Sequence, residues 1–256
     1  MQTNQVDDQP KITVITATYN CIDNIEITID SVLNQTYNNI EYIVIDGYSS
    51  DGTVQLINNK YEGKLSKFVS ERDRGISDAF NKGISYATGD LLFFLNAGDV
   101  ILETDVFQRV VRKWNVNRPD VLFYQVVIGQ NTIYPSERAD IKKDVWDKSQ
   151  LPHQGTFISK RIIDRVGSYN TALKIRMDYD YFARCRYENA TYEYIALPIV
   201  RYQLGGASMK IENNKTFYRE GLALSAIYEK KIYVRDLLMW LMPNVVVKIA
   251  RNLIKR

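Results

Sequence analysis

Residues 89–101, which read Gly-Asp-Leu-Leu-Phe-Phe-Leu-Asn-Ala-Gly-Asp-Val-Ile, constrain the fold more than any other stretch of the chain. The five apolar residues 91–95 are typical of a strand that is buried on both faces of a sheet. They lead directly into Asn96 and Asp99, so this strand brings hard oxygen atoms to its carboxyl end. Open α/β sheets bind ligands at that edge, where such oxygens can hold a divalent cation and, through it, a diphosphate. The alternative is a polar turn that closes a core strand.

Strands alternate with helices through the first hundred residues. Apolar runs predict strands at residues 12–17, 41–45, 68–70 and 91–95. Helical spacing and cap residues predict helices at residues 25–33, 54–60 and 77–87. This order predicts an α/β fold with a mainly parallel central sheet flanked by helices. Each strand is followed by a polar residue that we expect at one shared edge of the sheet, namely Asn20, Asp46, Asp73 and Asp99.

The second half of the chain changes in character. We expect, in order, a helix at 104–114, a hairpin of 121–128 and 132–134, a core strand at 151–158, a helix at 161–166, a helix that opens at Asp178 and a strand at 192–197. The core strand carries the only histidine, His153, and the last strand is expected to end at Pro198. Residues 202–208 then form a glycine-containing loop.

The composition fits one α/β domain with an appendage, because 45% of the 256 residues are hydrophobic and 25% are charged. Residues 1–10 are expected to be a disordered leader without the apolar segment of a signal peptide. No run reaches the roughly 18 apolar residues that span a bilayer. Cys21 and Cys185 are too few and too far apart for a disulfide framework or a zinc site, which fits a reducing, cytoplasmic compartment.

Positive charge is concentrated near the C-terminus. The net charge is +3, but residues 210–256 hold ten Lys or Arg and four Asp or Glu, so they carry +6 and the preceding residues −3. Residues 245–256 have the apolar and basic faces of an amphipathic helix. We therefore expect a basic, amphipathic helical tail over 210–256, whose part 237–256 contacts a membrane surface. The alternative is a helix packed on the body or on a second subunit of a homo-oligomer. Nucleic acid is not expected as a partner, since no recognition motif is present.

An ordered set of motifs connects these elements. It consists of Thr-Ala-Thr-Tyr-Asn at 16–20, Ser-Val-Leu-Asn-Gln-Thr-Tyr at 31–37, Glu-Tyr-Ile-Val-Ile-Asp-Gly at 41–47, Ser-Asp-Gly-Thr at 50–53, Ser-Glu-Arg-Asp-Arg-Gly-Ile-Ser-Asp-Ala-Phe-Asn-Lys-Gly at 70–83, Ala-Thr-Gly-Asp at 87–90 and Phe-Leu-Asn-Ala-Gly-Asp at 94–99. Over residues 11–209 the chain resembles the family-two, inverting glycosyltransferases of the GT-A fold, of the type that assembles bacterial polysaccharides. The resemblance implies a nucleotide-binding half at 11–103 and an acceptor half at 104–209.

The resemblance also implies a donor site at the strand ends. Thr18 and Tyr19 would frame the base and ribose, and Asp46 would accept a hydrogen bond from a uracil or thymine ring. Asp73 matches the position that closes over the base and diphosphate. The implied nucleotide-sugar site is Thr18, Tyr19, Asn20, Asp46, Asp73, Arg74, Lys82, Asn96, Ala97 and Gly98. Candidates for contact with the acceptor, or for a loop that folds over the donor, are His153, Gln154, Gly206 and Ser208.

The metal and the catalytic base follow from the same resemblance. The family's metal motif contains Asp-x-Asp or adjacent acids, so Asp99 is the expected ligand of Mn²⁺ or Mg²⁺, with Asn96 as a neutral donor and Gly98 as a departure from the pattern. The family's base is an aspartate that opens a helix, which Asp178 matches, with Asp180 as the second candidate. From the residues alone, capping of the following helix is the alternative for both aspartates.

The resemblance implies transfer of a hexosyl or N-acetylhexosaminyl group from a nucleotide sugar, expected to be a UDP-sugar, to a saccharide or lipid-linked saccharide. The reaction would be a metal-assisted single displacement with inversion, in surface polysaccharide or glycolipid biosynthesis, on the inner face of the cell membrane if the tail binds lipid. Two alternatives stay open. A sugar nucleotidyltransferase needs a Gly-rich basic first loop, which residues 18–24 do not provide, and a catalytically silent scaffold subunit is supported by Gly98 and Met177.

Overall fold

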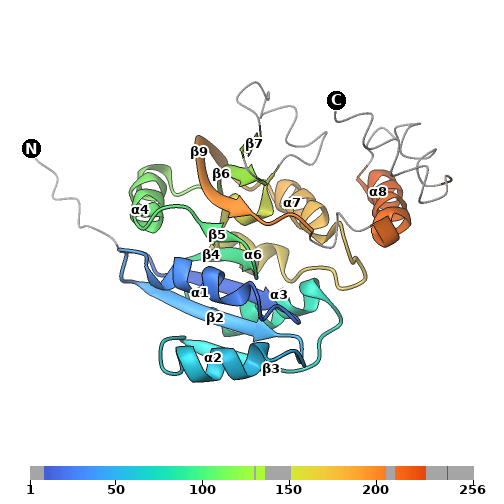
Figure 1. The fold of residues 1–256 in the computed structure, drawn as a ribbon. Helices are drawn as coiled ribbons and strands as arrows, with labels where there is room; N and C mark the ends of the chain where they lie inside the picture. The colour runs from blue at the N-terminus through green and yellow to red at the C-terminus, as the bar shows by residue number, and fades with distance from the viewer. Residues whose placement is uncertain (1–8, 130, 136–150, 206–210, 229–240, 242–256) are drawn as a thin grey trace, which may run out of the picture.

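A single sheet runs through the computed structural model, which describes residues 9–129, 131–135, 151–205, 211–228 and 241 (Figure 1). Among these residues the sheet has nine strands, in the order β3-β2-β1-β4-β8-β6-β9-β5 with β7 paired to β6. The first four are β1 (Ile12–Thr18), β2 (Ile40–Asp46), β3 (Lys67–Ser70) and β4 (Leu91–Asn96). They are parallel to one another, as the sequence predicted.

The register of these strands brings their polar ends together. Thr18 of β1 is paired with Asp46 of β2, and Ala17 of β1 is paired with Asn96 of β4. Because neighbouring strands end level with one another, the residues that follow them open onto one edge of the sheet. The predicted convergence of the strand ends is therefore confirmed.

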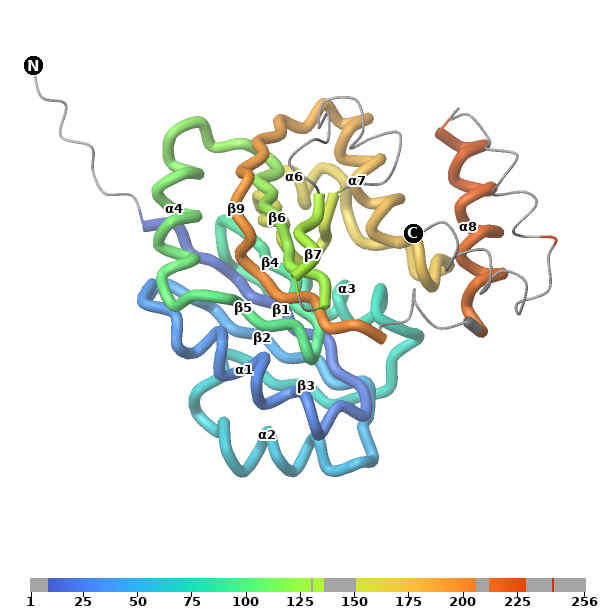
Figure 2. The backbone as a smooth tube through the Cα atoms, turned by 45° about the horizontal axis from the view of Figure 1, so that its top comes forward, coloured from blue at the N-terminus to red at the C-terminus, as the bar shows by residue number. Residues whose placement is uncertain are grey.

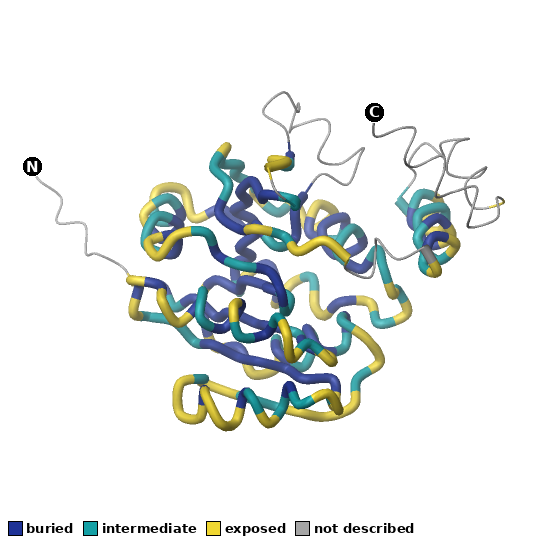
Figure 3. The backbone as a smooth tube through the Cα atoms, viewed as in Figure 1, coloured by how far each residue is buried: buried dark blue, intermediate teal, exposed yellow. Residues whose placement is uncertain are grey.

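Helices cover both faces of the parallel part of the sheet (Figure 2). They are α1 (Ile25–Leu33), α2 (Thr53–Tyr61) and α3 (Ile76–Tyr86). Apolar side chains of α1 and α2 pack with Val14 and Val44, whereas those of α3 pack with Ile15 and Ile43 on the opposite face. Successive side chains of a strand point to opposite faces, and both faces are covered by helices, so the strands have continuous apolar sequences. Most of their residues are buried (Figure 3).

The rest of the chain extends the same sheet with strands of mixed direction. Its strands are β5 (Val100–Ile101), β6 (Val121–Ile128), β7 (Thr132–Tyr134), β8 (Thr156–Ser159) and β9 (Tyr192–Tyr202). Its helices are α4 (Val106–Asn117), α6 (Lys160–Val166), α7 (Met177–Tyr187) and α8 (Asn214–Ile227). β8 is antiparallel to both β4 and β6, while β6 and β9 are parallel. The predicted hairpin is confirmed, because β6 and β7 pair in antiparallel fashion.

Two local expectations were wrong. His153 does not lie on a strand but in a 3₁₀ turn, η1 (His153–Gly155), because the Pro152 carbonyl accepts hydrogen bonds from Gly155 N–H at 3.0 Å and from Thr156 Oγ1 at 2.7 Å. The last strand does not end at Pro198 but continues through it. Proline has no N–H for the ladder, and the pairing with β6 shifts register beside it at Gln125.

Parts of the expected leader, loop and tail lie outside the described residues, including Gly206, Ser208 and nearly all of 237–256. At the start of the described chain, the carbonyls of Gln9 and Pro10 accept hydrogen bonds from Asn39 and Tyr37 at 2.8 and 2.6 Å. Of the described helices, none has both the length and the apolar character needed to cross a membrane.

Gly83 tests how closely α3 packs on the sheet. A Cβ atom there would lie 2.3 Å from Cγ2 of Ile15 on β1. Alanine in a helix is favoured over glycine by about 1 kcal/mol, but overpacking a core costs about 1–3 kcal/mol. Gly83→Ala should therefore lower the free energy of unfolding, measured with urea. The exposed Ser85→Ala on the same helix should change it by less than about 0.5 kcal/mol. A stabilised Gly83→Ala protein would contradict the packing described here.

Candidate active site

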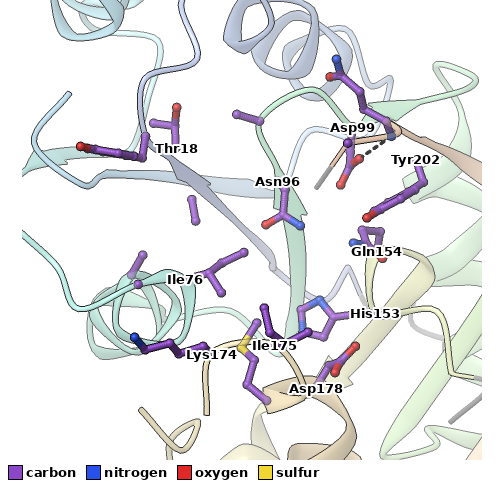
Figure 4. A pocket seen from close by; sticks show the side chains of 18 of the residues that line it. Thr18, Ile76, Asn96, Asp99, His153, Gln154, Lys174, Ile175, Asp178 and Tyr202 are labelled. Atoms are coloured by element: carbon purple, nitrogen blue, oxygen red, sulfur yellow. Dashed lines mark hydrogen bonds between the residues drawn. The ribbon is translucent and has the colours of Figure 1, made fainter. Parts of the chain in front are cut away.

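A cavity of about 840 Å³ opens at the carboxyl edge of β1 and β4 and extends to the N-terminus of α7 (Figure 4). Both halves of the chain line it. The predicted site residues that it brings together are Thr18, Tyr19, Asp73, Asn96, Ala97, Asp99, His153, Gln154 and Asp178. In Figure 4, Asn96 and Asp99 lie toward one end of the opening, and His153 and Asp178 lie toward the other.

Three oxygen atoms at the sheet edge are buried and have no hydrogen-bond partner. They are Thr18 Oγ1, Asn96 Oδ1 and Asp99 Oδ2, and all three residues line the cavity. Buried oxygens are rarely left unpaired in native proteins, so such a group points to a missing ligand. Hydroxyl, amide and carboxylate oxygens suit Mn²⁺ or Mg²⁺. No cluster of three or more His, Cys, Asp or Glu side chains occurs in the described part of the chain, so these residues would hold a cation only together with oxygens of a bound ligand.

Asp99 is only 2% exposed, and this burial raises the pKa of its carboxyl to about 7. Interactions with the main-chain N–H of Gln203 and with Asn96 act in the opposite direction but do not offset the burial. Asp99 Oδ1 accepts the Gln203 N–H at 2.9 Å, which leaves Oδ2 for a ligand. A nearby cation would favour the ionised carboxylate.

Gly98 departs from the acidic pattern for a structural reason. Its φ of 99° lies in the left-handed region that favours glycine. An added Cβ would lie 1.7 Å from Oε1 of Gln203, so the Gln203 side chain fills the space that a side chain at position 98 would need. Gln203 also donates from Nε2 to Asn24 Oδ1 at 3.2 Å. An acid at position 98 would therefore require this glutamine to move.

Asp178 lies in the first turn of α7 and faces the cavity. Burial raises the pKa of its carboxyl, while the N–H of Tyr179, which donates to Oδ1 at 2.7 Å, and the charge of Arg176 lower it. The second candidate, Asp180, does not line the cavity. Its Oδ2 pairs with Arg184 Nε at 2.9 Å, and its Oδ1 accepts the Tyr228 hydroxyl at 2.7 Å.

His153 lies in the cavity wall as a neutral side chain, since burial lowers its pKa to about 3. Its Nε2 shares a hydrogen bond of 2.8 Å with the Tyr169 hydroxyl, and its ring stacks on Phe80 at 5.4 Å. Gln154 lies beside it in the same wall. A neutral imidazole in this position can contact a sugar but is a weak acid or base at neutral pH.

Besides Asp180, five predicted residues do not line the cavity, namely Asn20, Asp46, Arg74, Lys82 and Gly98. Asp46 is fully buried, and its carboxylate accepts hydrogen bonds from Ser49 and Ser70. Lys82 pairs with Glu71 at 2.9 Å and donates to the Arg72 carbonyl at 2.7 Å. Arg74 pairs with Asp78 at 3.2 Å. Both basic side chains are therefore paired with acids, and neither lines the cavity.

Sequence reasoning missed several cavity residues. They are Lys174, Ile175 and Arg176 before α7, Tyr202 at the end of β9, Gln203 directly after it, and Phe217 and Tyr218 on α8. The basic residues just before Asp178 offered a signal, because they sit next to the expected base. The α8 residues offered none, since the sequence placed them in a tail.

Comparison with known proteins places the chain in a family. The family described as Glycosyl transferase family 2 matches residues 13–179. The chain belongs to this family. A PGL/p-HBAD biosynthesis glycosyltransferase of Mycobacterium tuberculosis is 28% identical over 214 residues, which are 82% of this chain and 84% of the relative. The UDP-Glc:alpha-D-GlcNAc-diphosphoundecaprenol beta-1,3-glucosyltransferase WfaP of Escherichia coli is 32% identical over 99 residues, 39% of each chain.

Solved structures show the same GT-A fold. TarS of S. aureus, residues 1–349 in complex with UDP, superposes with a TM-score of 0.70 at 18% identity, covering 90% of this chain and 69% of TarS. The mannosyltransferase PcManGT of Pyrobaculum calidifontis, in complex with GDP-Man and Mn²⁺, superposes with a TM-score of 0.69 at 16% identity, covering 95% of this chain and 75% of that one. The expected fold class and family are thus confirmed, and the chain is a glycosyltransferase of family 2.

The raised pKa of Asp99 makes a testable prediction for protein without added metal. Because the folded-state pKa of about 7 exceeds the unfolded value near 4, protonated Asp99 stabilises the fold below about pH 4, and this contribution is lost as the pH rises through 7. The free energy of unfolding, measured with urea, should therefore fall relative to that of Asp99→Asn, by up to about 4 kcal/mol.

Mn²⁺ provides the complementary measurement. At pH 8 the ion should raise the Tm of the wild type in the presence of a nucleoside diphosphate and should raise that of Asp99→Asn much less. If instead the difference in free energy of unfolding between the wild type and Asp99→Asn stays constant from pH 4 to 8, Asp99 is ionised throughout that range.

Proposed function

We propose that this glycosyltransferase moves a hexosyl or N-acetylhexosaminyl group from a UDP-sugar to a saccharide or lipid-linked saccharide, with inversion at the anomeric carbon. The observation that carries the proposal is one cavity with unpartnered oxygens at the sheet edge and a half-buried carboxylate, Asp178, at the N-terminus of α7. The first set suits a diphosphate and its cation, and the second suits proton removal from a hydroxyl.

The nucleotide would lie over the ends of β1 and β2. Tyr19 is 62% exposed beside the cavity, so its ring is available to a base or ribose. Gly47 packs against the Tyr19 ring and against Asp73. A Cβ atom added at Gly47 would lie 2.7 Å from Asp73 Oδ2. Asp73 in turn accepts the Gly75 N–H at 2.8 Å, which fixes the wall of this end. TarS has been crystallised with UDP and with UDP-GlcNAc, which supports a UDP-sugar as donor here.

Asp99, Asn96 and Thr18 are the residues that would hold Mn²⁺ or Mg²⁺ together with the donor diphosphate. The Mn²⁺ in the PcManGT complex supports a divalent cation in this fold. Such an ion, when bound, offsets the negative charge of the diphosphate leaving group. Lys174 and Arg176 add positive charge to the same cavity from the side of α7.

Asp178 would act as the general base. The acceptor hydroxyl oxygen attacks the anomeric carbon, the bond from that carbon to the diphosphate oxygen breaks, and the hydroxyl proton passes to Asp178. Attack from the face opposite the leaving group inverts the anomeric configuration. The raised pKa suits this role, because a carboxylate with a higher pKa is a stronger base than an ordinary aspartate. His153 and Gln154 would contact the acceptor.

The names of the relatives support an acceptor linked to lipid. WfaP is named for a GlcNAc-diphosphoundecaprenol acceptor, and the mycobacterial relative for PGL/p-HBAD biosynthesis. Such acceptors lie at a membrane surface. We therefore propose a cytoplasmic enzyme that reaches the inner face of the membrane through residues 237–256, in the assembly of a surface polysaccharide or glycolipid.

Release of nucleoside diphosphate from a panel of UDP-, GDP- and TDP-sugars tests the donor and the cation. We expect release from a UDP-sugar, stimulated by Mn²⁺ and reduced by chelation with EDTA. Asp99→Asn should lose most of the stimulation, because its amide lacks the negative charge that binds the ion. If no sugar nucleotide is bound or hydrolysed, with or without Mn²⁺, the protein is a silent member of the family.

Substitution of the two aspartates of α7 tests the base. Asp178→Asn should lower kcat by about 10²- to 10⁴-fold, which is the usual contribution of a general base, while UDP binds as before. Asp180→Asn is the matched control. It weakens the contacts with Arg184 and Tyr228 and should cost about 1–3 kcal/mol of stability without a comparable loss of kcat. Full activity of Asp178→Asn would show that another group removes the proton.

A further inference from the structure

Glu220 is a buried acid on α8 that belongs to no motif and lies beyond the residues matched by the family. Only 5% of it is exposed. Its carboxylate accepts hydrogen bonds from three consecutive main-chain N–H groups, those of Lys174 at 2.8 Å, Ile175 at 3.0 Å and Arg176 at 2.9 Å. Three charge-assisted bonds to neighbouring peptide groups fix the conformation of a segment far more firmly than one side-chain contact.

The segment that Glu220 holds leads directly into the proposed base. Lys174, Ile175 and Arg176 line the cavity, and α7 begins at Met177, one residue before Asp178. The N-terminus of a helix leaves N–H groups unpaired and favours a nearby negative charge. The Arg176 side chain precedes the helix and cannot accept a hydrogen bond, so the Glu220 carboxylate accepts the Arg176 N–H and adds its negative charge to the charges of Asp178 and Asp180 in the first turn.

Further contacts fix α8 against both sides of the base. Arg176 Nε donates to the Phe217 carbonyl at 3.0 Å, and its guanidinium lies 3.9 Å from the centre of the Phe217 ring. An added Cβ at Gly221 would lie 2.9 Å from Cζ of Arg176, so α8 approaches closely here. Beyond Asp178, Tyr228 donates its hydroxyl to Asp180. Phe217 and Tyr218 also extend the cavity wall.

We propose that Glu220 is a positioning residue for glycosyl transfer, which holds the main chain of residues 174–176 so that Asp178 meets the acceptor hydroxyl. The proposal rests on the function proposed above. It also makes α8 a functional part of the catalytic domain and not of a tail.

The charge of Glu220 has a second effect. Burial is the main reason why the pKa of Asp178 is raised, and the negative charge of Glu220 adds to it, whereas the charge of Arg176 opposes it. Among the described residues, Tyr134 and Tyr169 also interact electrostatically with Asp178, and burial raises the pKa of both hydroxyls, which keeps them neutral. His153 in the same cavity wall is neutral as well, and Asp180 in the same turn of α7 is paired with Arg184. Removing the Glu220 charge therefore lowers the pKa of Asp178 and moves the acidic limb of the kcat profile to lower pH.

Glu220→Gln and Glu220→Asp, each in the full chain, test the proposal. Glu220→Gln should lower the plateau kcat at least about tenfold, because small misplacements of catalytic groups are costly. It should leave the Kd for UDP within about twofold, since the nucleotide would bind at the other end of the cavity, and it should shift the acidic limb to lower pH. Glu220→Asp keeps the charge but is one methylene shorter, so it should lower kcat without moving the limb. The matched control is Glu212→Gln, which removes an exposed charge just before α8.

Amide hydrogen exchange separates positioning from general unfolding. The amides of residues 174–176 should exchange at least about tenfold faster in both Glu220 variants, while those of β1 and β4 keep the wild-type rate. Wild-type kcat and an unmoved acidic limb in Glu220→Gln, despite faster exchange at 174–176, would overturn the proposal. Faster exchange throughout β1 and β4, or a comparable loss in Glu212→Gln, would overturn it as well. Absence of transfer by the wild type, or full activity of Asp178→Asn, would instead refute the proposed function.

Discussion

The level ends of the parallel strands are the constraint on which the site depends. Because Thr18 is paired with Asp46 and Ala17 with Asn96, the oxygens that follow β1 and β4 meet without any need for long side chains. A shift of one residue in either pairing would turn these side chains to the opposite face of the sheet. The register in turn depends on the apolar side chains of both faces, so the core packing and the chemistry of the edge cannot vary independently.

Most of the first half of the fold could be predicted from the sequence, since each strand and helix there carries its own local signal. The apolar run 91–95 predicts a buried strand, and the acids that follow successive strands predict a shared polar edge of the sheet. The same reasoning gave Asp99 and Asn96, which line the cavity, whereas Asp178 followed only from the resemblance to the family. Lys82 and Arg74 were harder, because the direction of a long basic side chain depends on which acid lies nearest, and Glu71 and Asp78 pair with them instead.

The features of the site that could not be predicted from the sequence depend on contacts between residues far apart in the chain. Nothing near Gly98 in the sequence reveals that Gln203 fills the space beside it, and nothing near Glu220 reveals the three N–H groups of residues 174–176. The turn at His153 is likewise set by Pro152 and Thr156 together and not by apolar periodicity. A local pattern identifies an element, whereas these features exist only once two elements have been packed against each other.

The contact between Asp99 and Gln203 joins the two halves of the enzyme. Asp99 belongs to the half that would bind the donor, and Gln203 follows β9 in the half that would bind the acceptor, yet one hydrogen bond of 2.9 Å connects them. A ligand that displaces Gln203 removes a donor from Asp99, and a ligand on Asp99 alters the energy of holding Gln203. Thermodynamic linkage makes such an influence equal in both directions. Occupancy of the proposed donor and acceptor subsites would therefore be coupled through the peptide N–H of Gln203.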